Sequence, residues 1–201
     1  MLRPTLFLLL AGVLQIVSAH FELKYPTTRG FDETKEPTFP CGGFDTVQNR
    51  TQVPLKDAFV EINSGHTSYS YVVNVLAKND PTTADFSTAV VAVSSGTRNY
   101  PQAACLSLNL SNGTGITNGS NATIQVIFNG GDGLLYQCTD VTFVDSAPNF
   151  DQSMCVNADG SSTATSSGSA PAANNTQSKA SSVTVSSGFL LLVIACIYIT
   201  V

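Results

Sequence analysis

Short runs rich in β-branched and aromatic residues, each bounded by turn residues, constrain the fold most strongly. In the run "CLSLNL" at 105–110, Leu106, Leu108 and Leu110 alternate with polar residues, a pattern typical of a strand with one buried face. The other runs lie at 21–25, 58–62, 69–77, 87–93, 122–128 and 134–144. About seven strands without long helical periodicity predict an all-β fold: an antiparallel β-sandwich of immunoglobulin-like or fibronectin-like type.

The N-terminal segment has the features of a signal peptide. Arg3 precedes an apolar run, and Val17, Ser18 and Ala19 offer small residues for cleavage. We predict that residues 1–19 are removed after Ala19, so that the mature chain begins with His20; cleavage after Ser18 is the alternative. The folded domain is then expected at 20–156.

The C-terminal segment predicts a membrane attachment. Residues 189–201 are apolar and uncharged, but this run is shorter than the roughly 20 residues that span a bilayer. A Ser/Thr-rich stalk at 157–188 precedes it. We predict a GPI signal whose tail, 189–201, is removed, with attachment between Asn174 and Ala180; a short tail anchor is the alternative. The expected location is the outer face of the plasma membrane, through its outer leaflet, or the cell wall.

The charge of the mature chain excludes nucleic acid as an expected partner. From residue 20 to residue 174 there are seven basic residues and fourteen carboxylates. Such a surface repels phosphates and attracts cations, including metal ions.

Four cysteines fall in the predicted domain, and Cys196 lies in the tail. An even number in an oxidising compartment predicts two disulfides, for which the sequence alone permits three pairings. We predict Cys41–Cys155, which would fasten the N-terminal region to the end of the domain, and Cys105–Cys138, which would join two strands.

Six sequons predict a glycoprotein. Four of them crowd the stretch 109–123, and we therefore expect the loop "SNGTGITNGSN" at 111–121 to be exposed and not to be a binding interface. The predicted sites are Asn49, Asn109, Asn112, Asn118, Asn121 and Asn174.

The chain has two histidines, and their positions suggest a metal site. An N-terminal His20 offers its α-amino group and its Nδ1, which together chelate a metal, and His66, at a predicted turn, could add a third nitrogen. This arrangement is a histidine brace. Three nitrogens in a plane suit Cu(II), whereas Zn(II) prefers a tetrahedral set. We therefore predict one copper ion (Cu2+) per chain.

Several stretches together resemble one family. They are "HFELKYPTTRGFD" from 20 to 32, "FPCGG" from 39 to 43, "GHT" from 65 to 67, "LYQCTDVTF" from 135 to 143, and the Ser-rich stalk. The chain resembles the fungal GPI-anchored copper-binding proteins that are similar to lytic polysaccharide monooxygenases, the copper acquisition factor-like family. The resemblance implies a β-sandwich, a brace of His20 and His66 with an added Asp ligand, and copper handling at the cell surface in place of polysaccharide oxidation.

The Asp ligand implied by the resemblance falls on Asp140. Two-residue alternation puts Asp140 on the same strand face as Cys138, which suggests that it is tucked in beside a site. Asp145, nearer the end of this run, is the alternative. A carboxylate bound to copper would stabilise Cu(II) and occupy a position that oxygen chemistry needs.

Three classes of function remain open at this point. The first is a non-enzymatic protein that captures or buffers extracellular copper and passes it to a plasma-membrane copper transporter. The second is a copper-dependent lytic polysaccharide monooxygenase, against which stands the absence of Trp and the scatter of the Tyr residues along the sequence. The third is a structural wall mannoprotein in which His20 has no role. A hydrolase is disfavoured because the sequence contains no G-x-S-x-G motif.

Overall fold

The computed structural model describes residues 20–111 and 114–162, and these residues form two β-sheets. The smaller sheet has the order β1-β3-β6 and is antiparallel throughout. Its strands are β1 (Phe21–Tyr25), β3 (Phe59–Ser64) and β6 (Gln102–Ser107). Phe21 pairs with Ser64, so β1 begins beside the residue at which β3 ends.

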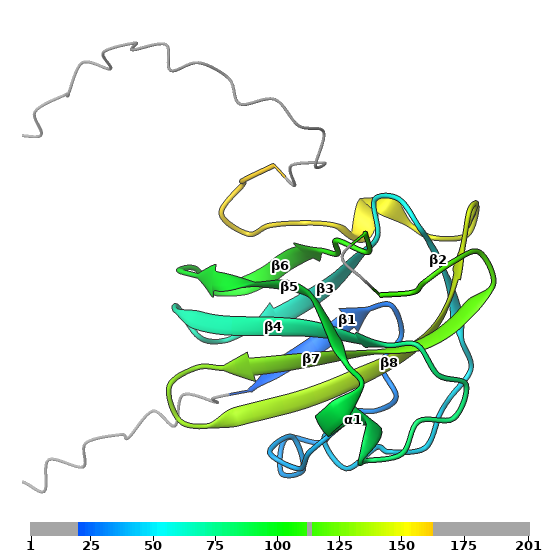
Figure 1. Cartoon of the computed structure of the whole chain (residues 1–201). Coiled ribbons are helices and arrows are strands. Elements are labelled where there is room, and N and C mark those ends of the chain that lie inside the picture. Colours follow the sequence, from blue (N-terminus) through cyan, green and yellow to red (C-terminus); the bar gives the residue numbers. More distant parts are fainter. Residues whose placement is uncertain (1–19, 112–113, 163–201) are drawn as a thin grey trace, which may run out of the picture. The chain divides into compact units, whose positions relative to one another are not determined.

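The larger sheet has the order β2-β8-β7-β4-β5. Its strands are β2 (Thr51–Pro54), β4 (Tyr69–Leu76), β5 (Val91–Arg98), β7 (Ser120–Asn129) and β8 (Leu134–Val144). The long β7–β8 hairpin lies beside β4 (Figure 1). The predicted all-β sandwich is confirmed.

The strands differ from the prediction in three places. β2 is an additional strand and pairs parallel with β8. The run at 87–93 begins in a short helix, α1 (Asp85–Thr88), so its strand starts only at Val91. The predicted loop at 111–121 ends earlier than expected, because β7 begins at Ser120.

The core lies between the sheets and follows from the alternation of each strand. On β8, Val141 and Phe143 point inward and are fully buried, and Phe128 of β7 is buried with them. Burying one such large apolar side chain stabilises the folded state by roughly 1.5–3 kcal/mol relative to leaving it exposed.

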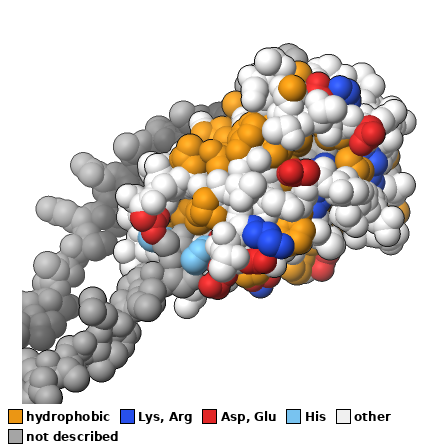
Figure 2. All heavy atoms as spheres, turned by 90° about the horizontal axis from the view of Figure 1, so that it is seen from below, with side chains coloured by type: hydrophobic (Ala, Val, Ile, Leu, Met, Phe, Trp, Pro, Cys, Tyr) orange, Lys and Arg blue, Asp and Glu red, His pale blue; other side chains and the backbone are white. Residues whose placement is uncertain are grey.

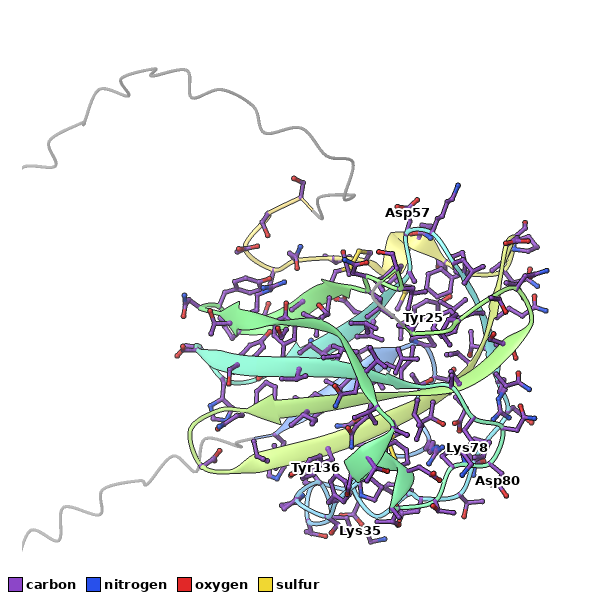
Figure 3. All side chains as sticks on the ribbon, viewed as in Figure 1. Tyr25, Lys35, Asp57, Lys78, Asp80 and Tyr136 are labelled. Atoms are coloured by element: carbon purple, nitrogen blue, oxygen red, sulfur yellow. A yellow bond between two sulfur atoms is a disulfide. The ribbon has the colours of Figure 1, made fainter. Side chains whose placement is uncertain are left out.

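On the opposite face of the larger sheet, the segment 26–50 packs against β8 and the adjacent part of β7. Cys138 points to this side, and there it forms a disulfide with Cys41. The two cysteines pack with Leu76 and with Phe86 of α1 in a second, smaller cluster. Lys35 lies in this covering segment and Tyr136 on the adjacent β8 (Figure 3), and the Tyr136 N–H donates to the Glu36 carbonyl at 2.9 Å.

The predicted disulfide pairing is wrong. The structure joins Cys41 to Cys138 and Cys105 to Cys155. Cys105 belongs to β6 of the smaller sheet, whereas Cys138 lies on the outward face of the larger sheet. The core therefore separates the two thiols that the sequence suggested as partners. Cys105 is instead bonded to Cys155, which directly follows the 3-10 turn at Gln152–Met154 and is thereby attached to β6.

Several predictions concern residues outside the described ranges: the signal peptide, Asn112, Asn174, most of the stalk, and the GPI tail with Cys196. Asn49, Asn109 and Asn118 are exposed, as predicted for glycosylation sites. Within 20–111 and 114–162, the structure contains no helix with the length and apolar character needed to cross a membrane.

Candidate metal centre

The fold brings the two histidines to the same end of the smaller sheet. His20 immediately precedes β1, whose first residue pairs with Ser64 at the end of β3. His66 follows two residues later, and its backbone N–H donates to the Ser64 hydroxyl at 3.0 Å. The start of β1 (blue) accordingly lies at the end of the domain that carries the β7–β8 hairpin (Figure 1).

The Phe128 ring connects the surroundings of both histidines. It stacks on Phe21, with the ring centroids 4.9 Å apart, and its centroid lies 5.8 Å from that of His66. Tyr69 closes the cluster at 4.7 Å. Because Phe128 comes from the larger sheet, packing between the sheets sets the position of both histidines.

His66 has a nitrogen that is available to a ligand. Its Nε2 is buried and has no hydrogen-bond partner among the described residues. A buried polar atom without a partner costs about 1–3 kcal/mol. A Cβ built at Gly130 would lie 2.6 Å from the same Nε2, so glycine at this position leaves room for the imidazole.

His20 lies between two carboxylates. Its Nδ1 is 3.9 Å from Oε2 of Glu33, and its Nε2 is 3.9 Å from Oε2 of Glu36. The His20 side chain borders a hollow of about 180 Å³ that Phe31 and Gly65 also line. Figure 2 shows histidine side chains (pale blue) at one end of the molecule, with acidic side chains (red) close to them.

Glu36 is buried although it is acidic. Burial raises the pKa of this carboxyl to about 7, against the opposing effect of a hydrogen bond from Gln137. The Gln137 amide donates to Glu36 Oε1 at 2.6 Å, and among the described residues Oε2 has no hydrogen-bond partner.

The donor set fits the predicted brace. Within the described ranges, no three His, Cys, Asp or Glu side chains lie close enough together to hold a metal ion. A brace needs only two such side chains, because its third nitrogen is the α-amino group of the first residue. His20 and His66, at one end of the fold, are the residues that would supply the two imidazoles.

Asp140 does not lie with the histidines, and its predicted role as a ligand is wrong. Its carboxylate faces the covering segment 26–50, where Arg29 Nε donates to Oδ2 at 2.8 Å and Arg29 NH2 to Oδ1 at 2.8 Å. Asp140 pairs with Thr123, and the stretch of β7 from Thr123 to Phe128, beside His66, is about 17 Å long at the usual strand rise. The prediction that Asp140 shares a strand face with Cys138 is correct. The partner of the Asp140 carboxylate on that face is Arg29, however, and not a metal site with the histidines.

The alternative, Asp145, lies farther away still. It follows the end of β8, whereas the hairpin beside His66 joins the start of β8 to β7. On the hairpin, Gly130 lies against the His66 ring, and the exposed Asp132 follows two positions later. Sequence reasoning missed Asp132, Glu36 and Gln137; the Gly-rich turn "NGGDG" marked the hairpin, but not what packs against it.

The fold and the site define a class: a two-sheet, all-β domain with a histidine pair where β1 begins. The family model described as "Copper acquisition factor BIM1-like" matches residues 18–160. The chain therefore belongs to the copper acquisition factor BIM1-like family, and the predicted resemblance is confirmed.

Curated relatives agree with this assignment. Copper acquisition factor BIM1 of Cryptococcus neoformans var. grubii is 38% identical over 134 residues, which are 63% of this chain and 61% of the relative. The chain thus spans about three fifths of the length of that relative. An uncharacterized protein of Aspergillus fumigatus is 37% identical over 82% of this chain and 70% of its own length. The lytic polysaccharide monooxygenase-like protein ham-7 of Neurospora crassa is 32% identical over 72% of this chain and 71% of its own length.

Proposed function

We propose that this protein is a cell-surface copper-binding protein that captures or buffers extracellular Cu(II) for uptake. His20 and His66 hold one copper ion in a histidine brace, after signal-peptide cleavage has freed the α-amino group of His20. A GPI anchor holds the protein in the outer leaflet, and a plasma-membrane copper transporter receives the metal. Membership of the BIM1-like family and the names of its relatives support the choice of copper.

The observation that carries the proposal is that both histidines lie at the same end of the fold. They are distant in sequence, yet the β1–β3 register and the Phe128 ring bring them to one end of the fold. The buried, unpartnered Nε2 of His66 is the atom that a metal ion would satisfy, within the described part of the chain. Nitrogen donors of this kind favour Cu(II) over other divalent ions.

We propose Asp132 as the carboxylate ligand, in place of Asp140. The resemblance implies an aspartate at the metal, and the β7–β8 hairpin that packs on His66 carries Asp132 at its exposed turn. Glu33 is the competing carboxylate, since its Oε2 lies 3.9 Å from His20 Nδ1. A negative ligand would stabilise Cu(II) over Cu(I), which favours holding copper over activating oxygen.

Copper titration of the processed protein, followed by electron paramagnetic resonance, tests the brace. We expect one Cu(II) per chain, and we expect His66→Ala to weaken binding roughly 100-fold or more, equal to about 2.7 kcal/mol. Thr67→Ala, on the same exposed turn, is the matched control and should bind as the wild type does. Retaining Ala19 as an extra first residue should also abolish tight binding, because an amide nitrogen replaces the amine. Unchanged affinity in both altered proteins would reject the brace.

The same titration separates the two carboxylates. We expect Asp132→Asn to change the Cu(II) spectrum and to raise the reduction potential of the bound metal, while Glu33→Gln changes neither. The reverse result would assign the ligand to Glu33.

The enzymatic alternative is a copper monooxygenase, because several relatives bear lytic polysaccharide monooxygenase-like names. We expect the copper-loaded protein, given a reductant and peroxide, to release no oxidised oligosaccharides from cellulose, chitin or xylan. Release of such products by the wild type, and not by His66→Ala, would favour the enzyme.

A further inference from the structure

We propose that Glu36 is a positioning residue for the metal centre: its buried carboxylate accepts the Nε2–H of His20 and thereby leaves Nδ1 of the ring available to copper. This inference rests on the proposed function, since it assigns a role to Glu36 within the same site. It concerns the tautomer of His20 and adds no ligand.

The need for such a residue follows from the chemistry of the brace. The first residue chelates the metal through its α-amino group and Nδ1, so the single proton of a neutral imidazole must be on Nε2. The proton is held at one ring nitrogen by the hydrogen bond which that nitrogen makes. Carboxylates commonly orient metal-binding histidines in this way.

The two carboxylates beside His20 differ in the way this role requires. Glu33, on the Nδ1 side, has a side chain that is 58% exposed, so water can hydrate it. Glu36, on the Nε2 side, has a side chain that is only 2% exposed. Of these two carboxylates, the one on the Nε2 side is therefore the one that is shielded from water.

The free oxygen of Glu36 is the one that faces the ring. Oε1 accepts from Gln137 at 2.6 Å, whereas Oε2 is buried with no hydrogen-bond partner in the described part of the chain. The separation of 3.9 Å between Oε2 and His20 Nε2 exceeds a hydrogen bond, and a ring movement of about 1 Å closes it. If the His20 ring were fixed through Nδ1, its Nε2–H would donate to Glu36 Oε2, and this buried oxygen would gain a hydrogen-bond partner.

Gln137 connects Glu36 to the backbone of the first mature residues. The amide nitrogen that donates to Glu36 also donates to the Phe21 carbonyl at 2.6 Å, and the amide oxygen accepts from the Leu23 N–H at 3.0 Å. One side chain on β8 thus holds both the start of β1 and the carboxylate beneath His20. The position of Oε2 relative to the His20 backbone is therefore fixed by the fold before copper arrives.

Nitrogen-15 NMR of the metal-free protein, at a pH of about 8, tests the proposal without copper. The chain has two histidines, so the His20 ring signals are readily assigned. We expect the Nε2–H tautomer to dominate in the wild type and to lose its dominance in Glu36→Gln. The matched control Glu33→Gln, which removes the exposed carboxylate at the same distance, should keep the wild-type tautomer.

Copper affinity supplies the second measurement. We expect Glu36→Gln to weaken Cu(II) binding by roughly 10-fold to 100-fold, the usual effect of losing a hydrogen-bond partner of a ligand. A dominant Nδ1–H tautomer in the wild type, or an unchanged tautomer in a folded Glu36→Gln, would overturn the proposal. If Glu36→Gln does not fold, the wild-type tautomer and the shorter Glu36→Asp decide instead. If the wild type holds the Nε2–H tautomer but binds no copper, the proposed function fails while the contact between Glu36 and His20 stands.

Discussion

Replacing Asp140 by alanine removes the acidic half of a buried ion pair. The carboxylate accepts two hydrogen bonds from Arg29, one from the Thr123 hydroxyl at 2.7 Å and one from the Gln48 backbone N–H at 2.8 Å. The side chains of Arg29 and Asp140 are 1% and 0% exposed. Although burial opposes ionisation, these hydrogen bonds outweigh it and hold the pKa of Asp140 below its ordinary value.

The expected loss follows from the guanidinium that remains. Truncating one partner of a buried pair leaves an uncompensated charge and costs about 3–5 kcal/mol, against about 0–1 kcal/mol for a pair at the surface. We therefore expect Asp140→Ala to lower the free energy of unfolding of the metal-free protein by about 3–5 kcal/mol, measured by urea denaturation. Asp145→Ala, an exposed position just beyond the same strand, should stay within about 0.5 kcal/mol of the wild type.

Two further variants make the reasoning refutable. Replacing both partners, as Arg29→Met with Asp140→Leu, should recover most of the loss, because no charge is then left buried. Asp140→Asn should bind copper with the wild-type affinity and spectrum if it folds. A stability loss below about 1 kcal/mol in Asp140→Ala, or an altered copper spectrum in folded Asp140→Asn, would contradict a structural role for Asp140.

The remaining predictions concern the hairpin beside His66 and a second buried carboxyl. Gly130→Ala should displace the His66 ring and weaken copper binding roughly tenfold. Copper affinity equal to that of the wild type, measured by titration, would count against this packing. Burial raises the pKa of Glu61 from 4.5 to about 7, partly offset by a hydrogen bond from the Val156 N–H. The folded state therefore keeps a proton that the unfolded chain loses, and stability falls by about 3 kcal/mol as the pH rises from about 4.5 to about 7. Urea denaturation across this range should show that fall in the wild type relative to Glu61→Gln; parallel curves would exclude it.

The strands were readily predicted from the sequence because alternation is a local property. The runs at 21–25 and 134–144 coincide with β1 and β8. Strand β2 was missed because its four residues carry no alternation long enough to recognise and it forms by pairing with β8. The start of β5 was misplaced because Ser87 and Thr88 end a short helix instead.

The sequence by itself determined the all-β class, the acidic surface and the two histidines as the candidate ligands, since each depends on composition or on near neighbours along the chain. Only the tertiary structure decided which carboxylates and cysteines meet. Alternation correctly put Asp140 and Cys138 on one face of β8, but what covers that face is the segment 26–50, which brings Arg29 and Cys41. The partners of a buried polar group come from distant segments that pack across it, and the spacing of residues along one strand carries no information about them.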